Sequence, residues 1–190
     1  MTTYERRAGS ALDAAETIFA HEGYGSASMR EVAAAAGLSV AGLYYYLPSK
    51  NQALFAICKR AFKALSNALD EALESSADAQ TRLRAFVRGH VEFLSGHPQA
   101  YRVLLHDMAA LQGPEREEIG GLRRRYFARA NDLIVGVQQE HTSAISTHVA
   151  TAALFGMMNW MPMWHREGDD ADCARIAGEM SLLFLHGVAA

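Results

Sequence analysis

The stretch SMREVAAAAGLSVAGLYYYLPSK, residues 28–50, decides the fold of this chain. Ser28 comes directly before an apolar run and Glu31 follows it by three residues, which is the capping-box pattern of a helix start. Gly37 ends this short helix, because glycine just after a helical pattern is a typical stop. A second short helix is predicted over residues 40–46. The stretch therefore predicts two short helices joined by a tight turn.

The spacing inside this stretch fits two helices that cross steeply. Such a crossing needs a small residue at the contact, a residue that tolerates positive φ in the turn, and an apolar residue that anchors the second helix. Ala33, Gly37 and Leu43 supply these three residues in order. The pattern therefore predicts a helix-turn-helix, the motif whose second helix reads DNA.

Taken as a whole, the stretch resembles the N-terminal DNA-binding domain of the TetR family of bacterial regulators. Alanine-rich helices and tyrosines at helical spacing also occur in ordinary helical cores, but the full spacing and the exit Pro48-Ser49-Lys50 favour DNA binding. Two positions depart from the family pattern, since Leu47 stands where the family usually has Phe and Tyr46 where it often has His. These changes keep an apolar anchor and a polar-tipped aromatic ring.

The resemblance implies a domain organisation and a function. It places a DNA-binding domain at residues 1–50 and a ligand-binding and dimerisation domain at residues 51–190. The implied function is a homodimeric repressor that binds a near-palindromic double-stranded DNA operator and is released by a hydrophobic small-molecule effector. Two recognition helices are also needed because one short helix covers too few base pairs.

The predicted DNA contacts follow from the chemistry of the second helix. Small and apolar groups favour thymine methyls and close backbone approach over bidentate hydrogen bonds to bases. Phosphate contacts are expected from hydroxyls, cationic groups and a helix N-terminus. The residues expected to face bases are Val40, Ala41, Gly42 and Tyr45, and those expected to bind phosphates are Ser28, Arg30, Tyr44, Tyr46 and Lys50.

Charge does not carry this prediction. The chain has a net charge of −3, and residues 1–60 hold six basic and five acidic side chains. Because non-specific affinity depends on the number of phosphates neutralised, a nearly neutral N-terminal region predicts modest non-specific DNA binding.

The rest of the chain reads as further helices. Apolar residues recur at helical spacing, Gly, Pro and Ser residues separate the segments, and no segment alternates with the period of a strand. The prediction is an all-α protein of about nine helices. The further helices are expected at 5–22, 49–73, 82–95, 99–111, 115–139, 143–165 and 171–187.

Thioether and aromatic side chains are dense near residues 157–164 and suit an adaptable apolar cavity. Pro162 is expected to bend the helix there. The local pattern is similar to TetR members that sense acyl-CoA thioesters, and plain core packing is the alternative. The candidate ligand-binding residues are Met108, Leu111, Phe127, Phe155, Met158, Trp160, Met161 and Trp164.

A cluster of arginines lies in the helix predicted over 115–139. These side chains either bind a CoA phosphate or form a solvated surface, and the solvated surface is favoured. The cluster consists of Arg123, Arg124, Arg125 and Arg129.

The last two predicted helices carry stripes of small and apolar residues that suit a two-fold four-helix interface. Packing inside one chain is the alternative. The candidate dimer residues are Ala152, Gly156, Ile176, Met180, Leu183 and Phe184.

Other classes of protein find little support in the sequence. Apolar runs are too short to span a membrane, the N-terminus has no apolar leader, and two cysteines are too few for a disulfide framework, so a cytoplasmic location is expected. The sequence contains no recognisable metal or catalytic motif, so neither cofactor nor catalytic residues are predicted. The alternatives that stay open are a multidrug-responsive repressor of an efflux pump and, from another class, a helical enzyme.

The predicted phosphate contacts can be tested by substitution. Tyr44→Ala or Lys50→Ala is expected to weaken operator binding and to leave dimerisation intact, because both side chains belong to the DNA-binding stretch. A gel-shift titration measures the affinity, and unchanged affinity would contradict the assigned roles.

Overall fold

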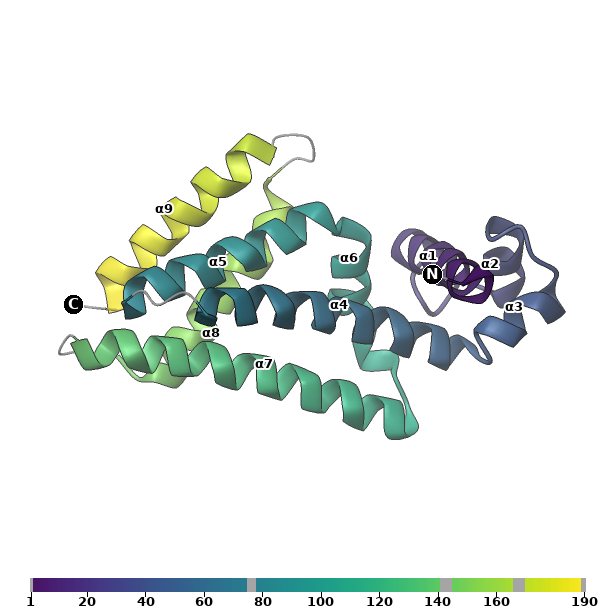
Figure 1. The fold of residues 1–190 in the computed structure, drawn as a ribbon, viewed down its shortest axis with the longest axis horizontal. Coiled ribbons are helices and arrows are strands. Elements are labelled where there is room, and N and C mark those ends of the chain that lie inside the picture. Colours follow the sequence, from purple (N-terminus) through teal and green to yellow (C-terminus); the bar gives the residue numbers. More distant parts are fainter. Residues whose placement is uncertain (1, 75–77, 141–144, 166–169, 189–190) are drawn as a thin grey trace. The chain divides into compact units, whose positions relative to one another are not determined.

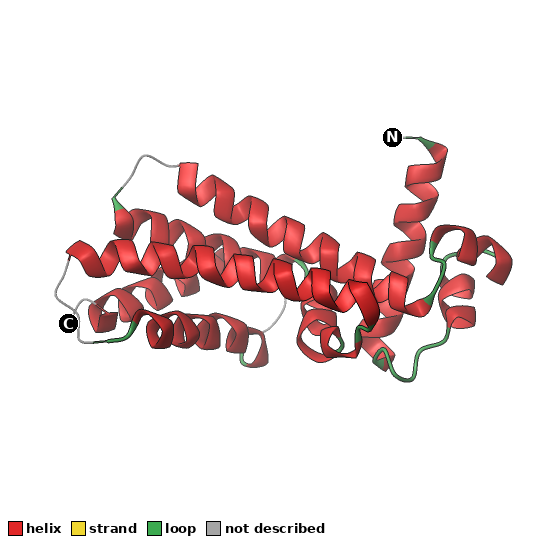
Figure 2. Ribbon diagram, turned by 90° about the horizontal axis from the view of Figure 1, so that it is seen from below, coloured by secondary structure: helices red, strands yellow, loops and turns green. Residues whose placement is uncertain are grey.

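The computed structural model describes residues 2–74, 78–140, 145–165 and 170–188. Over these residues the chain is all helical, as predicted, with nine α-helices, two short 3-10 helices and no strand (Figures 1 and 2). The α-helices are α1 Thr3–Glu22, α2 Met29–Ala35, α3 Val40–Tyr46, α4 Lys50–Glu74, α5 Ala79–Gly96, α6 Pro98–His106, α7 Gly113–Glu140, α8 Thr147–Trp160 and α9 Asp170–Val188. The 3-10 helices are η1 Met108–Ala110 and η2 Met161–Met163.

The described helices form two compact units. The first unit is drawn from Met1–Phe62 and Pro98–Leu122, and the second from Lys63–His97 and Arg123–Ala190. The long helices α4 and α7 contribute to both units. The predicted division after residue 50 follows the DNA-binding motif, whereas these units follow helix packing, in which α6 belongs with the N-terminal helices.

The helix-turn-helix of the first unit has the predicted geometry. The Ser28 hydroxyl accepts a hydrogen bond from the Glu31 amide, and the Glu31 carboxylate accepts one from the Ser28 amide, so the predicted capping box is present. Gly37 has φ +65°, where an L side chain would be strained. The Leu38 amide then donates to the Ala33 carbonyl at 2.9 Å, closing a Schellman turn.

Helix α1 ties this motif to the rest of the first unit. Its buried residues Ala11, Ala15 and Phe19 recur every fourth position and form one face, as expected of an amphipathic helix. Helix α6 packs against α1, and the Thr17 hydroxyl donates to Gln99 Oε1 at 3.0 Å. The Thr17–Gln99 hydrogen bond therefore joins α6 to α1, the helix that contacts α2 and α3.

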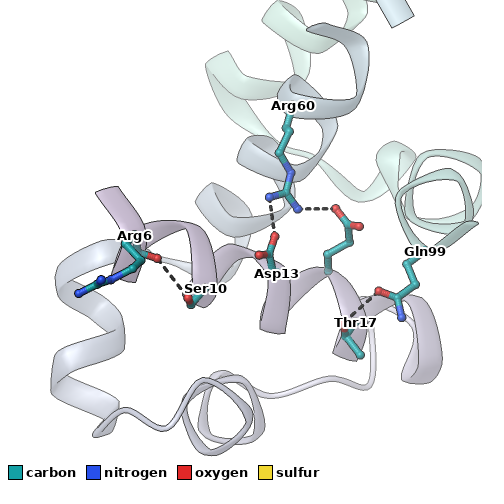
Figure 3. A network of polar contacts seen from close by, with 7 residues as sticks. Arg6, Ser10, Asp13, Thr17, Arg60 and Gln99 are labelled. Carbon is teal, nitrogen blue, oxygen red and sulfur yellow. Dashed lines mark hydrogen bonds and ion pairs between the residues drawn. The ribbon is translucent and has the colours of Figure 1, made fainter. Parts of the chain in front are cut away.

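Arg60 of α4 supplies a second connection to α1. Its guanidinium lies 2.6 Å from Asp13 Oδ1 and 2.8 Å from Glu16 Oε2, so one side chain pairs with both carboxylates (Figure 3). A planar guanidinium suits such paired contacts better than an ammonium does. The position of α1 against α4 is thus held by this paired contact.

The second unit is organised around α5, which contacts α8 and α9. Its inward residues Leu83, Phe86 and Val87 are almost fully buried. Gly89 lies where α4 passes closest, because a Cβ at this position would stand 3.1 Å from the Ala68 Cβ. The backbones of α4 and α5 therefore approach more closely than side chains at both positions would allow.

Some predicted helix boundaries are wrong, each for a local reason. Helix α5 begins at Ala79, three residues before the predicted Arg82, because the Asp78 side chain accepts the Thr81 amide at 2.8 Å. The predicted helix 99–111 divides into α6 and η1.

The helix predicted over 143–165 also differs from the structure. It ends at Trp160, and Pro162 lies in η2 instead of bending a continuous helix. Proline has no amide hydrogen to continue the helical ladder, so the chain tightens into a 3-10 turn at this point. The predicted start at Ser143 lies outside the described residues.

Candidate nucleic-acid interface and effector site

Helix α3 presents the side chains expected to read DNA. Its anchor Leu43 is fully buried, while Val40, Ala41 and Tyr44 are exposed. Tyr45 is more exposed than Val40 or Tyr44, with 69% of its surface accessible. Because the anchor faces inward, the predicted base-facing residues are turned toward solvent on one short helix.

The start of α3 is fixed by a cap from Ser39, and this cap leaves little space for a side chain at position 42. The Gly42 amide donates to Ser39 Oγ at 3.0 Å. A Cβ on Gly42 would stand 3.1 Å from that same oxygen, closer than most real contacts. Gly42, which was predicted to face the bases, thus also leaves room for the cap that starts the helix.

The N-terminus of α2 is the second part of the predicted interface. Ser28 Oγ donates to Glu31 Oε2 at 2.6 Å, so this hydroxyl is already engaged inside the chain. Hydrogen bonds from the side chain and backbone of Ser28 lower the pKa of the Glu31 carboxyl, which keeps it ionised. Arg30 is exposed beside them. Arg30 is therefore free to bind a phosphate with its exposed guanidinium. The Ser28 hydroxyl instead caps the start of α2.

Lys50 has a structural role that its sequence position did not indicate. Its Nζ donates to the Gly25 carbonyl at 3.3 Å and stands 4.6 Å from the centre of the Tyr24 ring. The Tyr24 amide in turn donates to Asp107 Oδ1 at 3.1 Å. Lys50 therefore ties the turn after α1 to the start of α4, so Tyr44→Ala is a cleaner test of phosphate binding than Lys50→Ala.

Tyrosine rings gather around α3. Tyr45 and Tyr46 contact one another edge to face, with ring centres 5.1 Å apart. Tyr4, in the first turn of α1, contacts both of them. Sequence reasoning missed Tyr4, because a contact between residues more than forty positions apart is decided only by the packing of the helices.

The second unit holds an aromatic cluster around Phe155 of α8, in which Phe155 and Phe127 are half-buried and Phe86 is buried. The Phe155 ring centre lies 5.4 Å from that of Phe127 and 6.0 Å from that of Phe86. Met158 and Met161 are buried in the same unit. These residues are four of the predicted ligand contacts together with one residue, Phe86, that was not predicted. Met108 and Leu111 belong to the first unit.

A buried polar group lies beside this aromatic cluster. His90 is only 4% exposed, its Nδ1 lies 2.9 Å from Tyr126 Oη, and its Nε2 lies 3.1 Å from Asn159 Oδ1. A neutral ring satisfies both contacts if Nε2–H donates to Asn159 and the Tyr126 hydroxyl donates to Nδ1. Burial lowers the pKa of His90 to about 4, and burial raises the pKa of Tyr126. The aromatic cluster therefore has a neutral, hydrogen-bonded polar edge.

The two tryptophans lie elsewhere. Trp160 is 63% exposed, and together with Trp164 it lines a surface groove of about 560 Å³ between α8 and α9. Ile176, Met180 and Leu183 contribute to the same groove, and an Arg175–Glu179 ion pair with a distance of 2.8 Å lies along it. The predicted ligand set is thus divided among the aromatic cluster, this surface groove and the first unit.

The predicted dimer residues also divide into two groups. Ala152, Gly156 and Leu183 are exposed, whereas Ile176, Met180 and Phe184 are buried within the chain. Both groups come from α8 and α9, where a stripe of small and apolar side chains was predicted. The buried group joins these helices to their own unit, and the exposed group remains available to a partner.

The remaining features are the arginines of α7, candidate metal ligands and candidate membrane-spanning helices. Arg123, Arg124 and Arg125 are all exposed, while Arg129 forms an ion pair with Asp70. Among the described residues, no group of three His, Cys, Asp or Glu side chains is placed to hold a metal ion. No helix in the described part of the chain is long and apolar enough to cross a membrane.

Comparison with known families identifies the chain. Residues 76–188 match the family model "Tetracyclin repressor-like, C-terminal domain", and residues 11–57 match "Bacterial regulatory proteins, tetR family". The chain belongs to the TetR family of transcriptional regulators. These two matches cover both predicted parts of this TetR-family chain, since one contains the helix-turn-helix and the other contains α5, α8 and α9.

Individual relatives agree with this family. The transcriptional activator FasR of Mycolicibacterium smegmatis is 33% identical over 103 residues, which are 54% of this chain and only about half, 47%, of that protein. The structure of PfmR from Thermus thermophilus is 28% identical, with a TM-score of 0.84 over 95% of this chain and 99% of that one. AibR, solved with isovaleryl coenzyme A and operator DNA, is 26% identical, with a TM-score of 0.83 over 93% and 97% of the two chains.

The buried His90 gives a pH prediction. The unfolded chain gains the proton near the ordinary pKa of 6.5, but the folded chain gains it only near 4, so protons favour the unfolded state between these values. The free energy of unfolding is expected to fall by up to about 3 kcal/mol between pH 7 and pH 4 through this residue. Urea unfolding at a series of pH values and one protein concentration measures it.

The matched variants isolate the contribution of His90. His90→Gln is expected to remove this part of the pH dependence, because glutamine does not titrate. His106→Gln, which changes an exposed histidine of α6, is expected to keep the wild-type dependence. A His90→Gln protein whose pH dependence equals that of the wild type would show that His90 is not held neutral by burial.

Proposed function

We propose that this TetR-family regulator is a homodimeric repressor whose two α3 helices read a near-palindromic operator. The observation that carries the proposal is the geometry of α3, in which buried Leu43 turns Val40, Ala41, Tyr44 and Tyr45 outward. Methyl groups and tyrosine rings suit thymine methyls and the shape of the groove more than bidentate base contacts. Phosphates are bound by Arg30, Tyr44 and the N-terminus of α2.

The exposed side of α8 and α9 supports a dimer. Helix α8 carries a stripe without charge at helical spacing, which consists of the exposed residues Val149, Ala152, Ala153, Gly156 and Trp160. On α9, Leu182 is exposed and Leu183 is 71% exposed. Apolar side chains of this size in one continuous region are typical of surfaces that a partner covers.

Helix glycines on this side strengthen the argument. Nothing lies within 4 Å of a Cβ built on Gly156 or Gly178, so packing inside the chain does not require glycine at either position. Glycine inside a helix costs about 1 kcal/mol relative to alanine. Close packing against the helices of a second copy would explain glycine at these positions, because small residues let two helix backbones pack tightly.

The effector is proposed to be a hydrophobic small molecule, with an acyl-CoA thioester preferred. The aromatic cluster around Phe155 offers apolar surface to such a molecule, and the adjacent His90 is held neutral by burial, so no charge opposes an uncharged ligand there. The complex of AibR with isovaleryl coenzyme A supports this class of ligand. A multidrug-responsive repressor remains the second candidate, since a cluster of aromatic rings also accepts flat drug-like molecules.

Release from the operator follows from a difference in affinity. An effector lowers operator affinity only as far as it prefers the conformation in which the two α3 helices are wrongly spaced. Helix α4 carries residues of both compact units and is the proposed lever. Its Arg60 is paired with Asp13 and Glu16 of α1, so a movement of α4 is passed to the helix that supports the motif.

The effector class is tested by thermal shift and operator release. Duplexes selected from a random DNA pool with the full-length protein provide the operator probe, and an inverted repeat is expected. Acyl-CoA thioesters of increasing chain length are expected to raise the melting temperature by several degrees at saturation and to release this probe. Stabilisation by cationic dyes alone would instead favour the multidrug candidate.

Two variants locate the effector. Phe155→Ala is expected to lose the thermal shift, because it removes the centre of the aromatic cluster. Trp164→Ala changes only the surface groove and is expected to keep the shift. The reverse pattern would place the effector in the groove between α8 and α9.

Dimerisation is tested at Gly156. Gly156→Leu is expected to weaken the dimer by at least tenfold in Kd, because the added side chain has room within one chain but not beneath a second helix. Sedimentation at micromolar concentration measures the change. Ala128→Leu, at an exposed position of α7, is the matched control and is expected to leave the dimer intact. An unchanged dimer in Gly156→Leu would move the interface away from α8.

A further inference from the structure

The first turn of α1 lies against the recognition helix through one aromatic side chain. The Tyr4 ring centre stands 5.3 Å from that of Tyr46 and 5.7 Å from that of Tyr45, and the second contact is edge to face with an interplanar angle of 89°. With the direct contact between Tyr45 and Tyr46, the three rings form a closed triangle, here called the tyrosine triangle. Each pair lies within the range in which aromatic rings attract one another.

The tyrosine triangle restricts two side chains that α3 alone would leave free to rotate. Successive residues of a helix point about 100° apart, so Tyr45 and Tyr46 do not share a face by helix geometry alone. Tyr45 has most of its surface exposed, and an exposed side chain without neighbours samples several rotamers. Tyr4 contacts both rings and restricts them before any DNA is present.

The position of Tyr4 is itself held by a local device. The Thr2 amide donates to Glu5 Oε2 at 2.6 Å, and the Glu5 amide donates to Thr2 Oγ1 at 3.2 Å. This capping box fixes the first helical turn, which would otherwise fray. Tyr4 is half exposed, at 50%, so its ring covers its neighbours without being part of the core.

We propose that Tyr4 is a positioning residue for operator recognition, acting through the rings of Tyr45 and Tyr46. This inference rests on the proposed function of α3 in DNA binding. Holding a side chain in its bound rotamer beforehand reduces the entropy lost on association, which raises affinity without a new contact to DNA. The first turn of α1 thereby becomes a functional part of the DNA-binding surface.

The test compares two substitutions at Tyr4 with the selected operator duplex as probe. Tyr4→Ala is expected to weaken operator binding about three- to tenfold, because Tyr45 and Tyr46 lose their restraint. Tyr4→Phe is expected to stay within about twofold of wild type, because the ring and not the hydroxyl makes the contacts. Thr3→Ala, an exposed change in the same turn, serves as the matched control and is expected to have no effect.

Two further measurements separate positioning from other roles. The dependence of affinity on salt is expected to keep its slope in Tyr4→Ala, because the number of neutralised phosphates is unchanged. In a double-mutant cycle, Tyr4→Ala is expected to cost less when Tyr45 is already alanine. The melting temperature of each variant shows that the fold is retained.

The outcomes decide between distinct explanations. Equal loss in Tyr4→Phe and Tyr4→Ala would mean that the hydroxyl binds DNA directly, which overturns the positioning role. Unchanged affinity in Tyr4→Ala, or strictly additive losses with Tyr45→Ala, would also overturn it. Failure of the wild-type protein to select any DNA would refute the proposed function instead, since that result does not depend on Tyr4.

Discussion

The burial of Leu43 at the crossing of α2 and α3 is the constraint on which the recognition surface depends. The turn at Gly37 sets the crossing, because only a residue that accepts φ +65° lets the chain leave α2 in that direction. Once Leu43 is inside, helical periodicity turns Val40, Ala41 and Tyr45 outward. The short helix needs this anchor, since seven residues have little helical stability of their own.

The rest of the first unit supports that crossing from behind. Arg60 pairs with two carboxylates of α1, Gln99 of α6 accepts the Thr17 hydroxyl, and Lys50 holds the turn between α1 and α2. Exposed ion pairs contribute little stability one by one. Their value here is geometric, because each joins α1 or the turn after it to a different helix. The recognition helix is therefore carried on a support that α4 and α6 both help to orient.

The second unit combines two surfaces of different chemistry. It places the His90–Tyr126–Asn159 chain beside the Phe155 cluster, and within the described residues every buried side-chain nitrogen or oxygen has a hydrogen-bond partner. A buried polar network costs stability when one of its groups lacks a partner, and it favours a single packing arrangement when every group has one. Its outer side carries exposed Trp160 and Leu183 near glycines with open space above them. In the proposed function, the aromatic cluster binds a small hydrophobic molecule and the outer side binds another copy of the chain, and these two proposed sites share no residue.

The sequence by itself determined the local elements and the family resemblance. The capping box at Ser28, the turn at Gly37 and the helix Val40–Tyr46 depend on contacts within a few residues, and all three have the predicted form. The tertiary structure alone decided which distant side chains meet. It brought Tyr4 to α3, buried His90 among aromatic rings, and placed Trp160 on the surface although its neighbours Met158 and Met161 are buried. Helical periodicity indicates which face of a helix is apolar, but the packing of other helices decides which apolar residues are covered and which polar residues are enclosed with them.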